Sequence, residues 1–92
     1  MKILAVCGMG LGSSMILKIQ IDKAARSLGI NADIELADIT IARSLAVNAD
    51  IIVTSKELAE RIGEVKGKII TITNYMDLNE MTNKLREAIG GA

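Results

Sequence analysis

The sequence predicts an α/β domain built on a four-stranded parallel sheet in the order 2-1-3-4, counted along the chain, with helices on both faces. Segments typical of strands alternate with helical periodicity four times within 92 residues, and the connections are short. Such repeats form parallel sheets with right-handed crossovers. Because Tyr75 is the only aromatic residue, aliphatic side chains and methionine have to build the core. We expect residues 1–92 to form one domain.

The first strand and helix follow from apolar spacing. Residues 1–6 form an apolar run, which predicts a central strand buried on both faces. Residues 13–28 follow helical spacing, and Gly29 provides a C-terminal stop. The apolar stripe of this helix consists of Leu17, Ile21, Ala24 and Leu28. Residues 31–37 alternate between apolar and acidic side chains, which is typical of a half-solvated edge strand.

The middle of the chain predicts a weaker helix, a strand and a capped helix. Residues 38–47 place four apolar side chains on one face, and Asp38 is available as the N-cap. These four are Ile39, Ala42, Leu45 and Ala46. The apolar segment 50–54 predicts the third strand, and Ser55 can cap a helix over residues 56–62.

The last quarter of the chain predicts one more strand and helix. Gly63 ends the preceding helix, and residues 68–73 form an apolar run typical of a fourth strand. Asp77 then caps a final helix, in which the apolar residues recur at helical spacing. These residues are Leu78, Met81, Leu85 and Ile89. We expect the helix to fray at the Gly90-Gly91 tail.

Cys7 is the single cysteine, and it stands where the first strand gives way to a glycine-rich loop over residues 8–14. A loop of this kind before a helix directs several backbone N–H groups into one concavity, and the helix dipole adds partial positive charge. It binds an oxyanion and favours the thiolate over the thiol. In the predicted strand order, the winding direction changes beside the first strand, where open α/β sheets bind ligands. We therefore expect Cys7 to be the reactive group.

Other interpretations of this loop agree less well with the sequence. Free cysteines are often buried as small hydrophobic residues, although core packing does not require three nearby glycines. A Walker motif would need Lys-Ser/Thr after the last glycine. A tyrosine phosphatase loop of the Cys-x5-Arg type would need arginine at Ser13, and the absence of histidine excludes a Cys-His dyad.

A nucleotide site stays open as the alternative function, in the form of a small nucleotide-binding α/β module that uses the loop of residues 8–12. A dinucleotide fingerprint that starts at Gly8 would need a third glycine where the chain has Ser13. Glu35, near the end of the second strand, could imitate the acidic residue that binds ribose in such sites.

Composition excludes several classes of partner. Eleven basic and eleven acidic residues cancel, which removes the electrostatic attraction that nucleic-acid binding needs. No apolar run approaches the roughly 20 residues that span a bilayer, so we expect no direct membrane insertion. A lone cysteine and the lack of a signal-peptide pattern indicate the cytoplasm. We expect neither a metal ion nor a cofactor.

Residues 7–15, Cys-Gly-Met-Gly-Leu-Gly-Ser-Ser-Met, resemble the active-site loop of the enzyme IIB components of the bacterial phosphoenolpyruvate-dependent sugar phosphotransferase system. The apolar lead-in at residues 3–6, the strand at 49–53 and the overall length extend the resemblance over nearly the whole chain. The ascorbate type is the most similar, because the lactose/cellobiose and galactitol types share the fold and the cysteine but carry fewer glycines in the loop.

The resemblance implies a single cytoplasmic IIB domain that acts as a phosphotransferase. Cys7 would accept phosphate from a phosphohistidine of enzyme IIA and pass it to a sugar, L-ascorbate for this type, bound by the membrane enzyme IIC. Backbone amides and two serine hydroxyls of the loop would hold the phosphoryl oxygens. These residues are Gly8, Met9, Gly10, Leu11, Gly12, Ser13 and Ser14. One of the two serines could instead serve only as the N-cap of the first helix.

A carrier docks with two proteins, so we expect exposed apolar residues around the loop. Met15 and Ile19 lie on the side of the first predicted helix that faces away from the stripe containing Leu17. Methionine suits a surface that meets two partners, because its flexible thioether repacks easily. The expected docking residues are Met9, Leu11, Met15, Ile19 and Met76, with Tyr75 beside the last of them.

Overall fold

The computed structural model describes residues 1–7 and 11–90 and, within them, the side chains of all residues except 11–14. Strands and helices alternate along this part of the chain, as the sequence predicts. They are β1 (Lys2–Cys7), α1 (Leu11–Ser27), β2 (Asp33–Asp38), α2 (Ala42–Ala46), β3 (Ile51–Thr54), α3 (Lys56–Ile62), β4 (Lys68–Thr71) and α4 (Leu78–Gly90).

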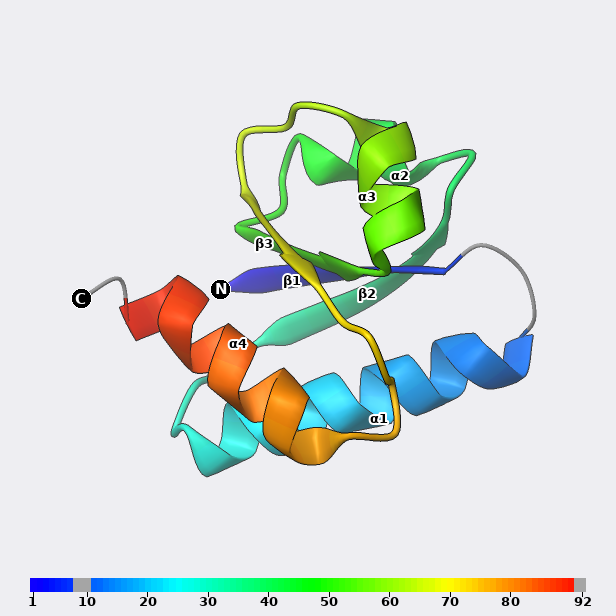
Figure 1. The fold of residues 1–92 in the computed structure, drawn as a ribbon. Coiled ribbons are helices and arrows are strands. Elements are labelled where there is room, and N and C mark those ends of the chain that lie inside the picture. Colours follow the sequence, from blue (N-terminus) through cyan, green and yellow to red (C-terminus); the bar gives the residue numbers. More distant parts are fainter. Residues whose placement is uncertain (8–10, 91–92) are drawn as a thin grey trace.

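The four strands form one parallel sheet in the order β2-β1-β3-β4, which confirms the predicted topology. Figure 1 shows β1 and β3 inside the sheet, with β2 and β4 at its edges. The inner strands are almost entirely buried because helices cover both of their faces. The edge strand β2 has a mixture of buried, partly buried and exposed residues, as its alternating sequence predicts.

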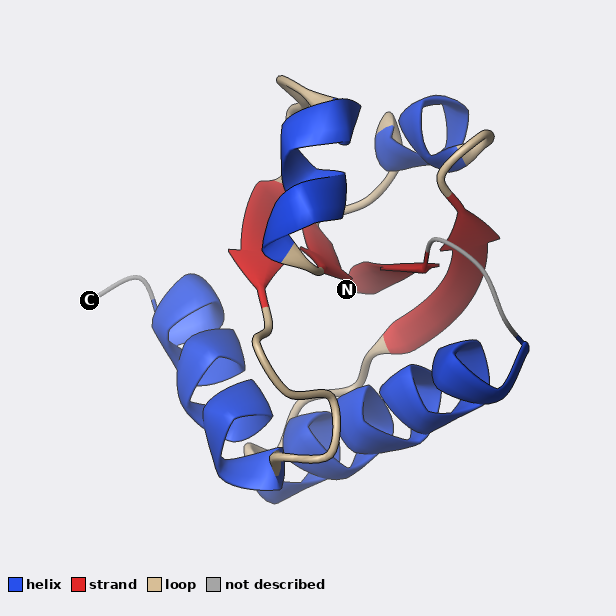
Figure 2. Ribbon diagram, turned by 45° about the vertical axis from the view of Figure 1, so that its right-hand side comes forward, coloured by secondary structure: helices blue, strands red, loops and turns tan. Residues whose placement is uncertain are grey.

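Two helical layers enclose the sheet, as Figure 2 shows. Alternate residues of β1 point to opposite faces, because side chains in a strand have a period of two. Ile3 and Ala5 pack into a core cluster under α1 and α4, and Leu4 and Val6 pack into a second cluster under α2 and α3. In the described part of the chain, no helix has both the length and the apolar character needed to cross a membrane.

The C-terminus of α1 ends at the predicted glycine. The Ile30 N–H donates to the Ala25 carbonyl at 2.9 Å, and the Gly29 N–H donates to the Arg26 carbonyl at 3.1 Å. This pair of bonds is a Schellman motif, which needs a left-handed backbone at its C′ position. Gly29 supplies that conformation with φ 72°. The predicted inner stripe is also confirmed, because Leu17, Ile21 and Ala24 are fully buried and Leu28 packs against them.

The second helix differs from the prediction. α2 begins at Ala42, and Asp38 is the last residue of β2 instead of the N-cap. The Asp38 carboxylate accepts the N–H groups of Thr40 at 2.9 Å and of Ile41 at 3.2 Å. These bonds close a turn of the kind that aspartate forms with its own backbone, so the chain turns before the helix can start. Ile41 occupies the cap position and makes no side-chain cap bond.

The last two helices are capped as predicted. The Ser55 hydroxyl accepts the Leu58 N–H at 3.3 Å, and the Asp77 carboxylate accepts the Glu80 N–H at 3.1 Å. Gly63 ends α3 with a positive φ of 77°. Gly90, however, is still part of α4, so the predicted fraying does not begin there, and Gly91 lies outside the described residues.

The fourth strand is shorter than the predicted segment 68–73, since β4 ends at Thr71. The Ile72 N–H still donates to the Thr54 carbonyl at 2.8 Å, so one further bond joins the chain to β3. Beyond it, the N–H groups of Thr73 and Asn74 both donate to the Glu80 carboxylate at 3.0 Å. A side chain from the following helix therefore takes the place of strand pairing here.

Candidate active site

Cys7 stands at the carboxyl end of the central strand β1. It pairs in register with Asp38 at the end of β2, and β3, which ends at Thr54, lies on the other side of β1. The winding direction of the sheet changes beside β1, and ligands of open α/β sheets bind at such a point. The predicted placement of Cys7 at this end of the first strand is confirmed.

The Cys7 side chain is almost fully buried, with 3% of its surface exposed. It packs in the same cluster as Ala5, Leu17 and Ile21, under α1 and α4. An anionic sulfur in such a place has lost most of its hydration, and N–H donors have to replace the missing water. The thiol therefore lies at the border of the core, at the last residue of β1.

The residues expected to hold phosphate are described only in part. Three of them lie outside the described residues: Gly8, Met9 and Gly10. Leu11, Gly12, Ser13 and Ser14 form the first turn of α1, without a description of their side chains. Because α1 begins at Leu11, neither serine occupies the N-cap position suggested by the sequence.

The early start of α1 has an electrostatic consequence. The first N–H groups of a helix have no partner within it, and the helix dipole gives this end partial positive charge. Figure 1 shows α1 beginning at the end of the sheet where β1 ends, and running back across one face. The helix thus places the amides of its first turn, which have no partner within the helix, at the same end of the sheet as Cys7.

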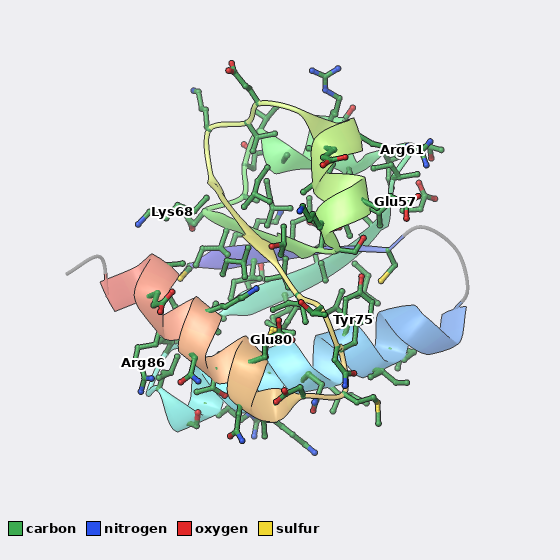
Figure 3. The ribbon with its side chains drawn as sticks, viewed as in Figure 1. Glu57, Arg61, Lys68, Tyr75, Glu80 and Arg86 are labelled. Carbon is green, nitrogen blue, oxygen red and sulfur yellow. The ribbon has the colours of Figure 1, made fainter. Side chains whose placement is uncertain are left out.

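Tyr75 lies on the connection between β4 and α4, and its side chain is half-buried against the cluster that contains Cys7 (Figure 3). Burial raises the pKa of the Tyr75 phenol, and the negative charge of the nearby Cys7 thiolate raises it further. The Ser55 hydroxyl, which lines the same hollow as Tyr75, acts in the opposite direction. The phenol and the thiol are therefore electrostatic neighbours.

A hollow of about 430 Å³ opens at the carboxyl ends of β3 and β4. Ser55, directly after β3, and Tyr75 bring two hydroxyl groups to its wall. The remaining lining residues are Ile16, Ile72, Thr73, Asn74 and Met76. The hollow thus presents polar groups from two strand ends next to apolar side chains, and it lies on the side of the sheet where Cys7 packs.

Glu80 holds the loop that carries Tyr75. Its carboxylate accepts the N–H groups of Thr73 and Asn74, each at 3.0 Å, and forms an ion pair with Lys84 at 3.3 Å. The pKa of Glu80 is lowered to about 2, mainly by the two backbone bonds and to a smaller extent by Lys84. Figure 3 shows Glu80 at the start of α4, on the same side of the sheet as Tyr75.

Ser55 and Glu80 are not among the site residues that the sequence predicts. For Ser55 a signal existed, because it follows the third strand directly, and the carboxyl ends of parallel strands meet at one edge of the sheet. Glu80 gave no such signal. Its bonds to Thr73 and Asn74 depend on the angle at which α4 meets the loop.

Glu35 does not support the nucleotide-binding alternative. It lies inside β2, in register with Leu4, and forms an ion pair with Lys2 at 2.9 Å. An acidic residue that binds ribose has to stand free at the carboxyl end of its strand. Within residues 1–7 and 11–90, no three His, Cys, Asp or Glu residues cluster in a way that could hold a metal ion.

Three of the five expected docking residues are described, and all three are exposed. Met15 has 54% of its surface exposed, Ile19 48% and Met76 68%. Met15 and Ile19 border a shallow hollow between α1 and β2, and Met76 borders the hollow beside Tyr75. Met9 and the Leu11 side chain lie outside the described part of the chain.

Comparison with known proteins gives consistent results. The family model for the "PTS system, Lactose/Cellobiose specific IIB subunit" matches residues 2–87. The ascorbate-specific PTS system EIIB component of Mycoplasma pneumoniae is 33% identical over 90 residues, which cover 97% of this chain and 95% of the relative.

Two solved structures share the fold. The lactose-specific IIB component domain of Streptococcus pneumoniae gives a TM-score of 0.60 at 19% identity, over 98% of this chain and 95% of that one. A domain of the fructose-specific IIABC component of Borrelia burgdorferi gives 0.56 at 18% identity, over 97% and 93%. At these sequence identities, the structural similarity supports a shared fold but no conclusion about function.

The match of the family model over nearly the full length agrees with the resemblance that the loop after Cys7 predicts. The parallel sheet and the position of the cysteine agree with it as well. The chain belongs to the PTS IIB family and is thus a IIB component of a sugar phosphotransferase system. Such IIB components are phosphotransferases.

Proposed function

We propose that this chain is a cytoplasmic phosphoryl carrier that acts through a thiophosphate on Cys7. The observation that carries the proposal is the position of Cys7, which ends the central strand where α1 begins, at the switch point of the sheet. Among the side chains near this point, the thiolate is the strongest nucleophile. The chain has no histidine that could take its place.

The transfer takes place in two displacements. The Cys7 Sγ attacks the phosphorus of a phosphohistidine on enzyme IIA, the S–P bond forms, and the imidazole leaves with the electron pair of the N–P bond. A sugar hydroxyl held by the membrane enzyme IIC then attacks the same phosphorus. The S–P bond breaks, the thiolate leaves with its electron pair, and the proton of the hydroxyl passes to water.

Backbone amides are the main source of electrostatic stabilisation in this account. The amides of residues 8–14, together with the hydroxyls of Ser13 and Ser14, hold the equatorial oxygens, where negative charge is concentrated during transfer. The start of α1 at Leu11 supports this role, because it leaves the amides of the first turn without partners in the helix. The chain lacks the arginine with which phosphatases of the Cys-x5-Arg type promote hydrolysis, so the phosphoryl group persists until a partner accepts it.

The name of the relative from Mycoplasma pneumoniae supports L-ascorbate as the sugar. The carrier touches the phosphoryl group, whereas enzyme IIC binds the sugar, so this assignment depends on likeness to that relative. The exposed residues Met15, Ile19 and Met76 support docking of both partners on the side of α1 and the loop after β4, with Met9 and Leu11 completing the surface.

Transfer of phosphate from a phosphorylated enzyme IIA tests the proposal. We expect the wild-type chain to take up one phosphate, and Cys7→Ala and Cys7→Ser to take up none. Membranes that contain enzyme IIC and L-ascorbate should then remove the phosphate from the wild type. Uptake that is equal in Cys7→Ala would overturn the proposed mechanism, and removal by a different sugar alone would overturn the assignment of ascorbate.

A further inference from the structure

Thr54 is a polar residue in the most buried part of the sheet. It is the last residue of β3, none of its surface is exposed, and the two residues before it in the strand are Ile52 and Val53. Buried positions of parallel strands are filled mainly by valine, isoleucine and leucine, and a buried hydroxyl is unfavourable unless it forms a hydrogen bond. Thr54 therefore needs a specific explanation.

The Thr54 hydroxyl donates a hydrogen bond to the Val6 carbonyl at 3.0 Å. Backbone pairing of β1 with β3 runs from the pair Ile3 and Ile51 to the pair Ala5 and Val53, one residue before Val6. The side chain of Thr54 thus extends the connection between these two strands beyond the end of their backbone ladder.

Thr54 is also held by the chain of β4, which lies on the side of β3 that faces away from β1. Its carbonyl accepts the Ile72 N–H at 2.8 Å, and it pairs in register with Thr71 of β4. The hydroxyl therefore projects from a fixed piece of backbone. Its bond to Val6 ties the end of β1 to the part of the sheet formed by β3 and β4.

The Val6 carbonyl and the Cys7 N–H belong to one planar peptide unit. Fixing the carbonyl fixes the plane of that unit and with it the position of the Cys7 backbone nitrogen, next to the Cα that bears the thiol. On its other side, Cys7 is held by its pairing with Asp38 of β2. A valine at position 54 would fill the same space and leave the Val6 carbonyl without this donor.

We propose that Thr54 is a positioning residue of the phosphoryl-transfer site, whose hydroxyl holds the Val6–Cys7 peptide and so directs the Cys7 sulfur toward the phosphoryl group. This inference rests on the proposed function of Cys7. The residue does not touch the phosphoryl group, and it acts through the backbone to which the nucleophile is attached. Displacement of a reacting atom by about 1 Å lowers a transfer rate by roughly a hundredfold.

The test compares Thr54→Val, which keeps the shape, with Thr54→Ser, which keeps the hydroxyl. Ile52→Val is the control for packing, because it removes one methylene from the same buried strand and leaves every hydrogen bond in place. The measurements are the rate of phosphate transfer from enzyme IIA and the pH dependence of Cys7 alkylation by iodoacetamide. Cys7 is the single cysteine, so alkylation reports on it alone.

We expect Thr54→Val to slow transfer roughly ten- to a hundredfold and to shift the alkylation profile. Thr54→Ser should restore most of the rate, and Ile52→Val should leave the rate and the profile unchanged. If Thr54→Val does not fold, Thr54→Ser is compared with Thr54→Ala, since these two variants differ only in the hydroxyl. Equal rates and profiles in Thr54→Val and the wild type, or equal losses in Thr54→Val and Ile52→Val, would overturn the inference.

Failure of the proposed function gives a different result. In that case the wild-type chain itself takes up no phosphate, whatever residue stands at position 54. The alkylation profile then decides the role of Thr54 separately. A profile that is the same in Thr54→Val and the wild type shows that the hydroxyl does not position the thiol, and a shifted profile that Thr54→Ser restores shows that it does.

Discussion

The Glu80 carboxylate binds the two backbone amides of Thr73 and Asn74, at the start of the loop that carries Tyr75. The pKa of this carboxylate in the folded protein is about 2, mainly because these two amides donate to its charged form. In the unfolded chain it returns to its ordinary value near 4.5. The folded state therefore binds fewer protons than the unfolded state between these two values.

This difference predicts a pH dependence of stability. A carboxylate with a lowered pKa contributes stability that is fully present above pH 4.5 and is lost as the pH falls toward 2. We expect Glu80→Gln to have a flatter decline in the free energy of unfolding over this range, as measured by urea titration at several pH values. Glu87→Gln, an exposed change on the same helix, is the control and should decline like the wild type. Identical declines in the wild type and Glu80→Gln would contradict the role of the two amides.

Tyr75 provides a second test at the scale of single residues. It is the only aromatic residue, so the absorbance change of its phenolate can be followed without interference. Burial and the Cys7 thiolate both raise the pKa of the phenol, so its titration midpoint should lie above 10. Cys7→Ala removes the negative charge and should lower this midpoint. A midpoint that is the same in both proteins would show that the two groups are not electrostatic neighbours.

At the scale of elements, glycine is required at two positions for different reasons: at Gly29, after α1, and at Gly67, before β4. Gly29 has a φ of 72°, but a Cβ there would meet nothing within 4 Å. A Cβ on Gly67, before β4, would approach the Ala49 carbonyl oxygen at 2.6 Å and that of Asp50 at 2.8 Å. The first position requires a backbone conformation, and the second requires space.

Alanine substitutions distinguish these two requirements. Gly29→Ala should lower the free energy of unfolding by roughly 1 to 2 kcal/mol, which is the cost of a left-handed backbone with a Cβ. Gly67→Ala should be more destabilising, because two backbone carbonyls have to move. Urea unfolding of both variants measures the difference. A smaller loss for Gly67→Ala than for Gly29→Ala would contradict the close approach to Ala49 and Asp50.

Some ends of helices and strands could be predicted from the sequence, and others could not. The ends of α1 at Gly29 and of α3 at Gly63, and the cap of α4 at Asp77, depend on local backbone chemistry, and all three are confirmed. The start of α2 and the end of β4 differ from the bounds that the sequence predicts. Asp38 and Glu80 bind backbone amides there, and a residue pattern does not distinguish these bonds from helix capping or strand pairing.

At the scale of the whole molecule, the periodicity of the sequence was sufficient for the sheet order and for the two helical layers. It also placed Cys7 at the carboxyl end of the central strand. The environment of Cys7 was less accessible to prediction. Thr54 binds the residue before Cys7, Tyr75 packs against the cluster of Cys7, and Glu80 binds the loop that carries Tyr75. These contacts form because strands and loops distant in sequence meet at one end of the sheet.

The exposed apolar side chains on α1 lead to a prediction about partner docking. Met15→Asp and Ile19→Asp should slow phosphate transfer from enzyme IIA or to enzyme IIC, because charge on the docking surface weakens binding. Val47→Asp is a matched control, since Val47 is 63% exposed and lies after α2, on the other layer of the molecule. All three variants should keep the circular dichroism of the wild type. Equal transfer rates in the three variants would place docking elsewhere.

The central claim is that Cys7 carries the phosphoryl group, and the position of the phosphate tests it most directly. Phosphorylated enzyme IIA is mixed with the wild-type chain and with Cys7→Ala, and the modified residue is identified by mass spectrometry of peptides. We predict one phosphate on the Cys7 sulfur in the wild type and none in the variant. Phosphate on Ser13 or Ser14, or on Cys7→Ala to the same extent as on the wild type, would contradict the account.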